Sequence, residues 1–207
     1  MTNNELTELC RSIRIQIIDA IYNAKSGHSG GSLSAVEILV ALYKKIMNIM
    51  PNEPAWEDRD RFILSKGHAA PALYTILTEC GYFPKETLST LRKIGSILQG
   101  HPDMRKTLGI DMSTGSLGMG ISNGIGMALA AKLSKKLYRT YVLCGDGELN
   151  EGQTWEAIMC AYKFKLDNLT LIVDNNKVQL DGPTDEIMPM KSIKDSIESF
   201  GWRVFAC

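Results

Sequence analysis

The chain has 207 residues, of which 44% are apolar and 22% charged, and its 23 basic residues balance its 23 acidic ones. This length allows one domain with a substantial core, and we expect a single domain over residues 1–207. The balanced charge argues against a nucleic-acid-binding protein, and the apolar content argues against disorder. No segment is long and apolar enough to span a bilayer, so we expect no membrane association.

The N-terminus and the cysteines predict a cytoplasmic protein. Residues 1–5 are polar and acidic, whereas a secretory signal peptide begins with a basic and then an apolar region. The five cysteines are odd in number and scattered, without a Cys-x-x-Cys pair. This usage is typical of buried thiols in a reducing compartment.

Hydrophobic periodicity predicts a series of amphipathic helices. Ser34 and Glu37 predict a capping box at the start of the second helix. Between the second and third predicted strands, a further helix is indicated by the helical spacing of Trp155, Ile158, Met159 and Tyr162. The other expected helices cover residues 4–24, 34–47, 69–77, 87–91, 118–136 and 192–200.

Short apolar runs between the helices predict the strands of an α/β fold, with a parallel sheet flanked by helices. The expected strands cover residues 61–65, 141–144, 169–173 and 202–207. The chain stops inside the last of them. We therefore expect that the C-terminal end of the domain is missing.

Polar residues follow two successive strands of this predicted sheet. Gly145-Asp146-Gly147 follows the strand at 141–144, and Asn176 closes an Asp-Asn-Asn run after the strand at 169–173. Parallel crossovers are right-handed, so both motifs should emerge at the carboxyl edge of the sheet, where α/β folds bind ligands. Carboxylate and amide oxygens suit Mg²⁺, whose other positions can be filled by phosphate and water. An ordinary turn and loop would explain either motif alone, but their order favours a metal site.

The sequence contains only three histidines, and each follows a glycine: His28, His68 and His101. Each is expected in a loop or at a strand end, where an imidazole can bind hydroxyls or a developing oxyanion. A loop residue bonded to nearby backbone is the simpler alternative for any one of them. A zinc trio is another, although zinc sites usually start from closely spaced ligands and these lie tens of residues apart.

The glycine-rich segment Ser-Thr-Gly-Ser-Leu-Gly at residues 113–118 precedes the long helix predicted at 118–136. Successive backbone N–H groups with a helix N-terminus behind them form a natural anion cradle. A glycine-rich turn without a ligand fits the segment equally well. The segment lacks the lysine of a P-loop and follows no clear strand, so ATP and NAD are poor candidates.

Taken together, five segments resemble the N-terminal part of transketolase, in order from about residue 5 to residue 205: residues 26–31, 65–69, 100–103, 113–118 and 145–152. The resemblance implies the thiamin diphosphate-binding fold (PP domain), with thiamine diphosphate and Mg²⁺ as cofactors. It implies a transferase of the pentose phosphate pathway. The reaction would move a two-carbon ketol unit from a ketose phosphate to an aldose phosphate.

The resemblance also implies roles for individual residues. The metal ligands would be Asp146, Asn176 and the backbone carbonyl of Val178. The substrate would be faced by His28, His68 and His101. Glu151 would lie in a subunit interface near the aminopyrimidine ring. The residues that line the cofactor would be Gly115, Ser116, Leu117 and Gly147.

The chain departs from the family pattern in two ways. The pyrimidine-binding domain is absent, with its activating glutamate and stacking aromatic residue, so we expect the chain to be inactive alone. Some family members split these domains between two genes, so we expect a heterotetramer with a separately encoded C-terminal subunit. The family's domain also continues past a strand like 202–207 and brings a further histidine to the diphosphate. The alternatives are a related thiamine enzyme with another sugar substrate and a catalytically incomplete binding or assembly protein.

Overall fold

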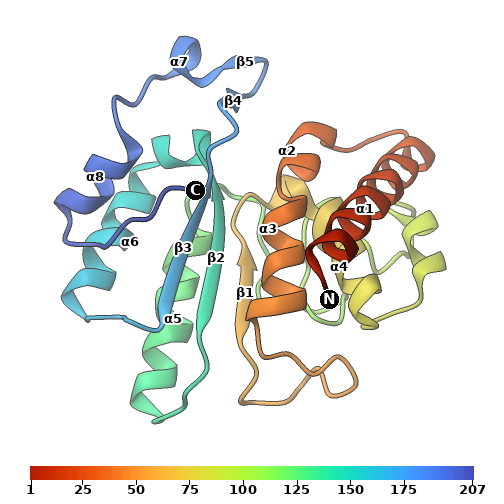
Figure 1. Ribbon diagram of the computed structural model, residues 1–207, viewed down its shortest axis with the longest axis horizontal. Helices are drawn as coiled ribbons and strands as arrows, with labels where there is room; N and C mark the ends of the chain where they lie inside the picture. Colours follow the sequence, from red (N-terminus) through yellow and green to blue (C-terminus); the bar gives the residue numbers. More distant parts are fainter.

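A computed structural model describes residues 1–207 and shows a parallel sheet between two layers of helices (Figure 1). Strands β1 (Arg61–Leu64), β2 (Thr140–Gly145) and β3 (Leu169–Asp174) lie in the order β1-β2-β3. The register pairs Leu64 with Leu143 and Gly145 with Asp174, so all three strands end at one edge. The expected α/β fold with a parallel sheet flanked by helices is confirmed.

The first helical layer covers one face of the sheet. It consists of α1 (Asn3–Ala24), α3 (Val36–Ala41) and α4 (Ala70–Cys80), shown to the right of the sheet in Figure 1. Successive strand residues point to opposite faces, and those that pack into this layer are Phe62, Leu64, Tyr141 and Leu143. α1 begins with a capping box, in which the Glu5 amide donates to the Thr2 hydroxyl at 3.3 Å.

The second layer covers the opposite face. It consists of α5 (Gly120–Leu133), α6 (Gly152–Lys163) and α8 (Ile193–Ser199). The alternate strand residues Ile63, Val142 and Cys144 pack into it. The central strand β2 is therefore buried on both faces, and β1 nearly so, which explains the continuous apolar runs in their sequences.

Short elements lie between these helices and strands along the chain. The helical ones are α2 (Ser29–Ser34), the π-helical turn η1 (Leu42–Ile46), and the 3₁₀ turns η2 (Gly67–Ala69), η3 (Lys85–Thr90) and η4 (Gly147–Asn150). Beyond the end of β3, a small arm carries β4 (Val178–Gln179), β5 (Gly182–Pro183) and α7 (Thr184–Ile187), at the top of Figure 1. No helix of the structure combines the length and apolar character needed to cross a membrane.

The predicted capping box at Ser34 is wrong. The helix expected at 34–47 is replaced by α2, α3 and η1, and Ser34 is the last residue of α2. Its hydroxyl donates a hydrogen bond to the Asp174 carboxylate at 2.5 Å, and Glu37 forms an ion pair with Arg14 instead. Tertiary partners therefore replace the local cap.

The helix predicted from the spacing of Trp155, Ile158, Met159 and Tyr162 is confirmed as α6. Its buried face is made by Thr154, Ala157, Ile158 and Ala161, so Met159 is 47% exposed and Tyr162 60% exposed. The strand predicted at the end of the chain needs correction. Residues 202–207 form no strand. The Trp202 indole donates to the Ile158 carbonyl at 3.0 Å, which holds the start of this segment against α6.

Two glycines on α5 allow a matched test of its packing on the sheet. A Cβ at Gly124 would lie 2.5 Å from the Val142 side chain, whereas one at Gly126 would meet nothing within 4 Å. We expect Gly124→Ala to lower the free energy of unfolding by about 1–3 kcal/mol through overpacking. Gly126→Ala should raise it by up to about 1 kcal/mol through helix propensity. Urea denaturation of both variants measures the difference, and equal effects would contradict the observed packing.

Candidate functional site

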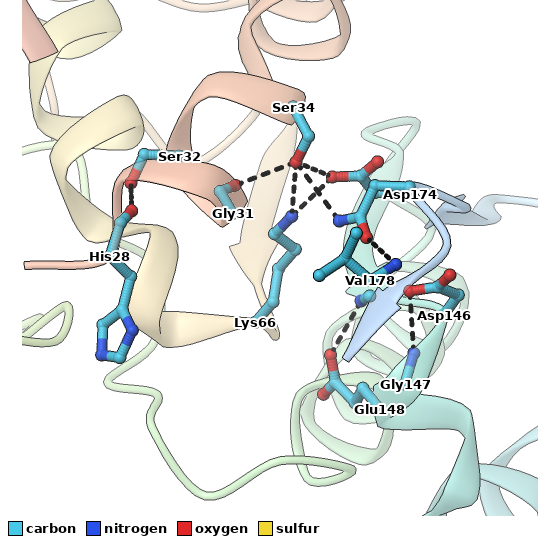
Figure 2. A network of polar contacts seen from close by, with 12 residues as sticks. His28, Gly31, Ser32, Ser34, Lys66, Asp146, Gly147, Glu148, Asp174 and Val178 are labelled. Carbon is cyan, nitrogen blue, oxygen red and sulfur yellow. Dashed lines mark hydrogen bonds and ion pairs between the residues drawn. The ribbon is translucent and has the colours of Figure 1, made fainter. Parts of the chain in front are cut away.

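Polar groups from all three strands meet at the carboxyl edge of the sheet (Figure 2). Lys66 and His68 follow β1, Asp146 follows β2, and the Asp174–Asn176 segment ends β3. The helix α2 lies against this edge through Ser34, whose hydroxyl donates to Asp174. This arrangement follows from the parallel topology, which brings every strand end to one side.

The Asp146 carboxylate is buried, with 4% of the residue exposed, and forms no ion pair. One oxygen accepts from the Gly147 amide at 2.9 Å. The other accepts from the Lys177 amide at 2.8 Å and from the Thr184 hydroxyl at 3.2 Å. Three neutral donors therefore orient the carboxylate but leave its charge without a protein cation.

The segment that follows β3 turns back over Asp146. The amide oxygen of Asn176 accepts from the Val178 N–H at 2.9 Å, and its NH₂ group lies 3.4 Å from the Ser34 hydroxyl. Lys177, between them, has a positive φ of 62°. This tight turn brings the Lys177 amide onto the Asp146 carboxylate, with Asn176 and Val178 on either side of Lys177 in the chain.

A buried ion pair that sequence reasoning missed lies beside this turn. The Lys66 ammonium is 2.5 Å from the Asp174 carboxylate, and the two side chains are 1% and 8% exposed. The Ser34 hydroxyl contacts both groups, at 2.5 Å from Asp174 and 3.3 Å from Lys66. Lys66 belongs to the Ser-Lys-Gly-His segment and Asp174 to the Asp-Asn-Asn run. The only sequence feature that could have indicated the pair is that each residue lies next to a predicted site residue.

The histidines gather at one side of the site. The rings of His28 and His68 have centroids 5.3 Å apart in an edge-to-face arrangement. A Cβ at Gly115 would lie 3.2 Å from the His101 ring, which places His101 against the glycine-rich segment. The structure has no group of three or more His, Cys, Asp or Glu side chains able to hold a metal, so the zinc trio is not supported.

Burial and neighbouring positive charges keep two of these imidazoles neutral. Burial lowers the pKa of His68 from 6.5 to about 4, with further contributions from the charges of Lys66, His28 and His101. Burial, followed by the charges of Arg92 and His28, also lowers the pKa of His101. These side chains can therefore donate or accept hydrogen bonds as neutral rings at pH 7.

The glycine-rich segment forms the floor between the histidines and the strand ends. A Cβ at Gly67 would lie 2.8 Å from the Gly115 amide nitrogen, and one at Gly118 would lie 2.7 Å from the Glu151 side chain. Glu151 itself is exposed and precedes α6 as its N-cap residue. Ser116 and Leu117 are exposed on the same segment. These glycines are required because any side chain would block the close approach of the loops.

Several features fit a bound diphosphate and metal ion. Asp146, Asn176 and the Val178 carbonyl are hard oxygen donors of the kind that Mg²⁺ accepts. In the glycine-rich segment, the Thr114 hydroxyl is buried without a hydrogen-bond partner. A polar cavity of about 300 Å³ lies against Asp146 and includes Lys177 and Lys191 in its lining. A Cβ at Gly147 would lie 2.8 Å from the Gln179 side chain.

Residues 6–207 match the family described as the thiamine diphosphate binding domain of transketolase. The chain belongs to the transketolase family. It is 47% identical over 191 residues to an apulose-4-phosphate transketolase subunit of Phocaeicola vulgatus, covering 92% of this chain and 68% of that protein. It is 48% identical over 200 residues to the 6-deoxy-6-sulfo-D-fructose transketolase subunit SqwG of a Clostridium species, covering 97% and 73%.

Solved transketolases share the fold. The enzyme from Campylobacter jejuni superposes with a TM-score of 0.90 at 34% identity, over 97% of this chain and 33% of that chain. The enzyme from Leishmania mexicana gives a TM-score of 0.90 at 32% identity, over 97% and 31%. This chain thus spans about a third of these transketolases but most of the relatives that are named as transketolase subunits. The predicted resemblance to the N-terminal part of the family is confirmed, and the alternatives are not favoured.

Breaking the buried ion pair between Lys66 and Asp174 should destabilise the fold strongly. In Lys66→Met the Asp174 charge stays buried without its partner, so we expect a loss of about 3–5 kcal/mol in the free energy of unfolding. Adding Asp174→Asn should recover part of this loss. As a control, Lys194→Met removes an exposed lysine 3.9 Å from Glu198 and should change stability by no more than about 0.5 kcal/mol. Chemical denaturation compares the variants; equal losses for both lysines would contradict the assignment.

The low pKa of His68 predicts a specific pH dependence. A histidine in the unfolded chain titrates near pH 6.5. Between that pH and about 4 the unfolded chain therefore binds a proton at this position, whereas folded His68 stays neutral. Its contribution to stability is therefore complete above pH 6.5 and is lost as the pH falls toward about 4. NMR titration of the three imidazoles, assigned with His68→Gln, should give His68 a midpoint near 4. A midpoint at or above 6.5 would contradict the burial of its ring.

Proposed function

We propose that residues 1–207 form a single diphosphate- and magnesium-binding domain, which serves as one subunit of a split transketolase. The reaction is transfer of a two-carbon ketol unit from a ketose phosphate to an aldose phosphate. The observation that carries the proposal is the buried Asp146 carboxylate, which lacks a protein cation and lies against the Asn176–Val178 turn. Membership of a thiamine diphosphate-binding family supplies the ligand that this geometry fits.

In this proposal Asp146, Asn176 and the Val178 carbonyl hold Mg²⁺, and the Gly147 amide region receives the diphosphate. Gly115, Ser116 and Leu117 line the cofactor. When bound, thiamine diphosphate supplies the electron sink for cleavage of the ketose carbon–carbon bond. The protein contributes orientation, because Asp146 is fixed by three hydrogen bonds before any ligand arrives.

The histidines act on the sugar. His68 and His101 are neutral at pH 7, so each can donate a hydrogen bond to a ketose hydroxyl or a developing oxyanion. His28 lies at the N-terminus of α2 and is exposed, which suits contact with the hydroxyls and protons of donor and acceptor. The packing of His28 against His68 holds the two rings in fixed relative positions.

The partner is a separately encoded C-terminal subunit that carries the pyrimidine-binding domain. Support comes from relatives that match most of this chain, because their names describe each of them as one subunit of a transketolase. We propose a cytoplasmic heterotetramer that acts on sugar phosphates, with Glu151 in the subunit interface near the aminopyrimidine ring. Glu151 is available for such a contact because its side chain is exposed at the start of α6.

The test is ketol transfer from xylulose 5-phosphate to ribose 5-phosphate, measured with this chain alone and with the C-terminal subunit of a split transketolase. We expect activity only in the mixture, and only with thiamine diphosphate and Mg²⁺. Asp146→Ala should lower the activity of the mixture more than about 100-fold, because it removes the one charged ligand of the metal. Asp19→Ala, on the exposed face of α1, is the matched control and should retain full activity.

Two results would contradict the proposal. Retained activity of Asp146→Ala at ordinary Mg²⁺ concentrations would overturn the metal assignment. Absence of activity in the mixture, with no binding of thiamine diphosphate, would favour a noncatalytic binding or assembly protein. Calorimetric titration of the cofactor into the mixture distinguishes this outcome from a wrong choice of sugars.

A further inference from the structure

Glu148 is the most deeply buried acidic residue next to the site, with 3% of its surface exposed. It lies in η4, two residues after Asp146 (Figure 2). One carboxylate oxygen accepts from the Ser65 hydroxyl and from the Gly118 amide, the latter at 2.8 Å. The other accepts from the Gly145 amide at 3.1 Å.

The three donors come from three different parts of the site. Ser65 precedes the turn that carries His68, Gly118 closes the glycine-rich segment, and Gly145 precedes Asp146. The partners are separated from Glu148 by 83, 30 and 3 residues in sequence. A single side chain therefore joins the substrate-facing turn, the cofactor floor and the metal-binding turn.

The arrangement is costly if its only purpose is stability. Glu148 forms no ion pair, and the nearby Lys66 ammonium is committed to Asp174. Burial raises the pKa of the Glu148 carboxyl, although its hydrogen bonds with Ser65, Gly118 and Gly145 oppose that effect. An apolar side chain could fill the same space without this desolvation cost. What an apolar residue cannot do is accept hydrogen bonds from three separate loops.

We propose that Glu148 is a positioning residue, which holds the Ser65–His68 turn, the glycine-rich segment and the Gly145–Gly147 turn in the geometry that binds thiamine diphosphate. This inference rests on the proposed function. Glu148 does not touch the ligand in this scheme. It acts through the backbone of the loops that do.

The test is Glu148→Gln in the assembly of both subunits. The amide oxygen can replace one carboxylate oxygen, but the NH₂ group then faces the N–H of Gly145 or Gly118, and one loop loses its acceptor. We expect the Kd for thiamine diphosphate at fixed Mg²⁺ to rise about 10- to 100-fold. At saturating cofactor, kcat and the KM values for the sugars should stay within about threefold, a split that general destabilisation would not produce. Glu86→Gln, an exposed carboxylate on η3, is the control and should leave all values unchanged.

A second readout is independent of the cofactor. Hydrogen exchange in the free chain should become faster at the Gly118 and Gly145 amides in Glu148→Gln, while exchange in the centre of α4 stays unchanged. If Glu148→Gln does not fold, Ser65→Ala removes one donor and keeps the carboxylate. We expect Ser65→Ala to raise the Kd for the cofactor about 3- to 10-fold.

The outcomes separate this inference from the proposed function. If the wild-type assembly binds thiamine diphosphate and the Kd is the same in Glu148→Gln, the positioning role is wrong and the proposed function stands. A lower denaturation midpoint without a change in Kd also contradicts the positioning role. If the wild-type assembly binds no thiamine diphosphate, the proposed function fails, and this inference fails with it.

Discussion

The buried ion pair between Lys66 and Asp174 is the constraint on which the site depends. It joins the end of β1 to the end of β3 across β2, and the Ser34 hydroxyl extends it to α2. A buried ion pair is a poor source of stability compared with apolar packing, but it tolerates little displacement, because separating the charges leaves each one desolvated. The pair therefore fixes the two turns that carry His68 and Asn176, because each of these residues lies two positions after a member of the pair.

Local order at the site comes from the turns that follow the strands. Gly145 and Gly147 flank Asp146, and the positive φ of Lys177 turns the chain so that its amide reaches the Asp146 carboxylate. Most hydrogen bonds of the Asp146 carboxylate come from backbone N–H groups, those of Gly147 and Lys177. Backbone donors are fixed by the fold itself, so the carboxylate is oriented without the entropy cost of ordering further long side chains.

The proximity of Asp146 and Asn176 could be predicted from the sequence because it requires only a right-handed crossover between two recognisable strands. The pairing of Lys66 with Asp174 could not, since the partners lie 108 residues apart and no local pattern marks either as paired. Ser34 shows the same limit. Its three-residue spacing to Glu37 predicts a helix cap, but in the structure its hydroxyl donates to the buried Asp174 carboxylate, 140 residues away in sequence. The strand expected at 202–207 failed because strand propensity does not specify a pairing partner, and Trp202 finds a hydrogen bond on α6.

The two carboxylates of the Gly145–Asn150 segment support the proposed cation at this edge. Asp146 and Glu148 are both buried and both accept hydrogen bonds from neutral donors only, whereas Asp174 and Asp111 are buried against Lys66 and Arg59. Coulomb interactions in a partly desolvated site are strong enough that uncompensated negative charge attracts a cation from solution. Glu148 is enclosed by Ser65, Gly118 and Gly145, so only Asp146 can reach such an ion. In the proposed scheme the two carboxylates therefore have different roles: Asp146 supplies negative charge to the metal ion, and Glu148 fixes the loops that surround the site.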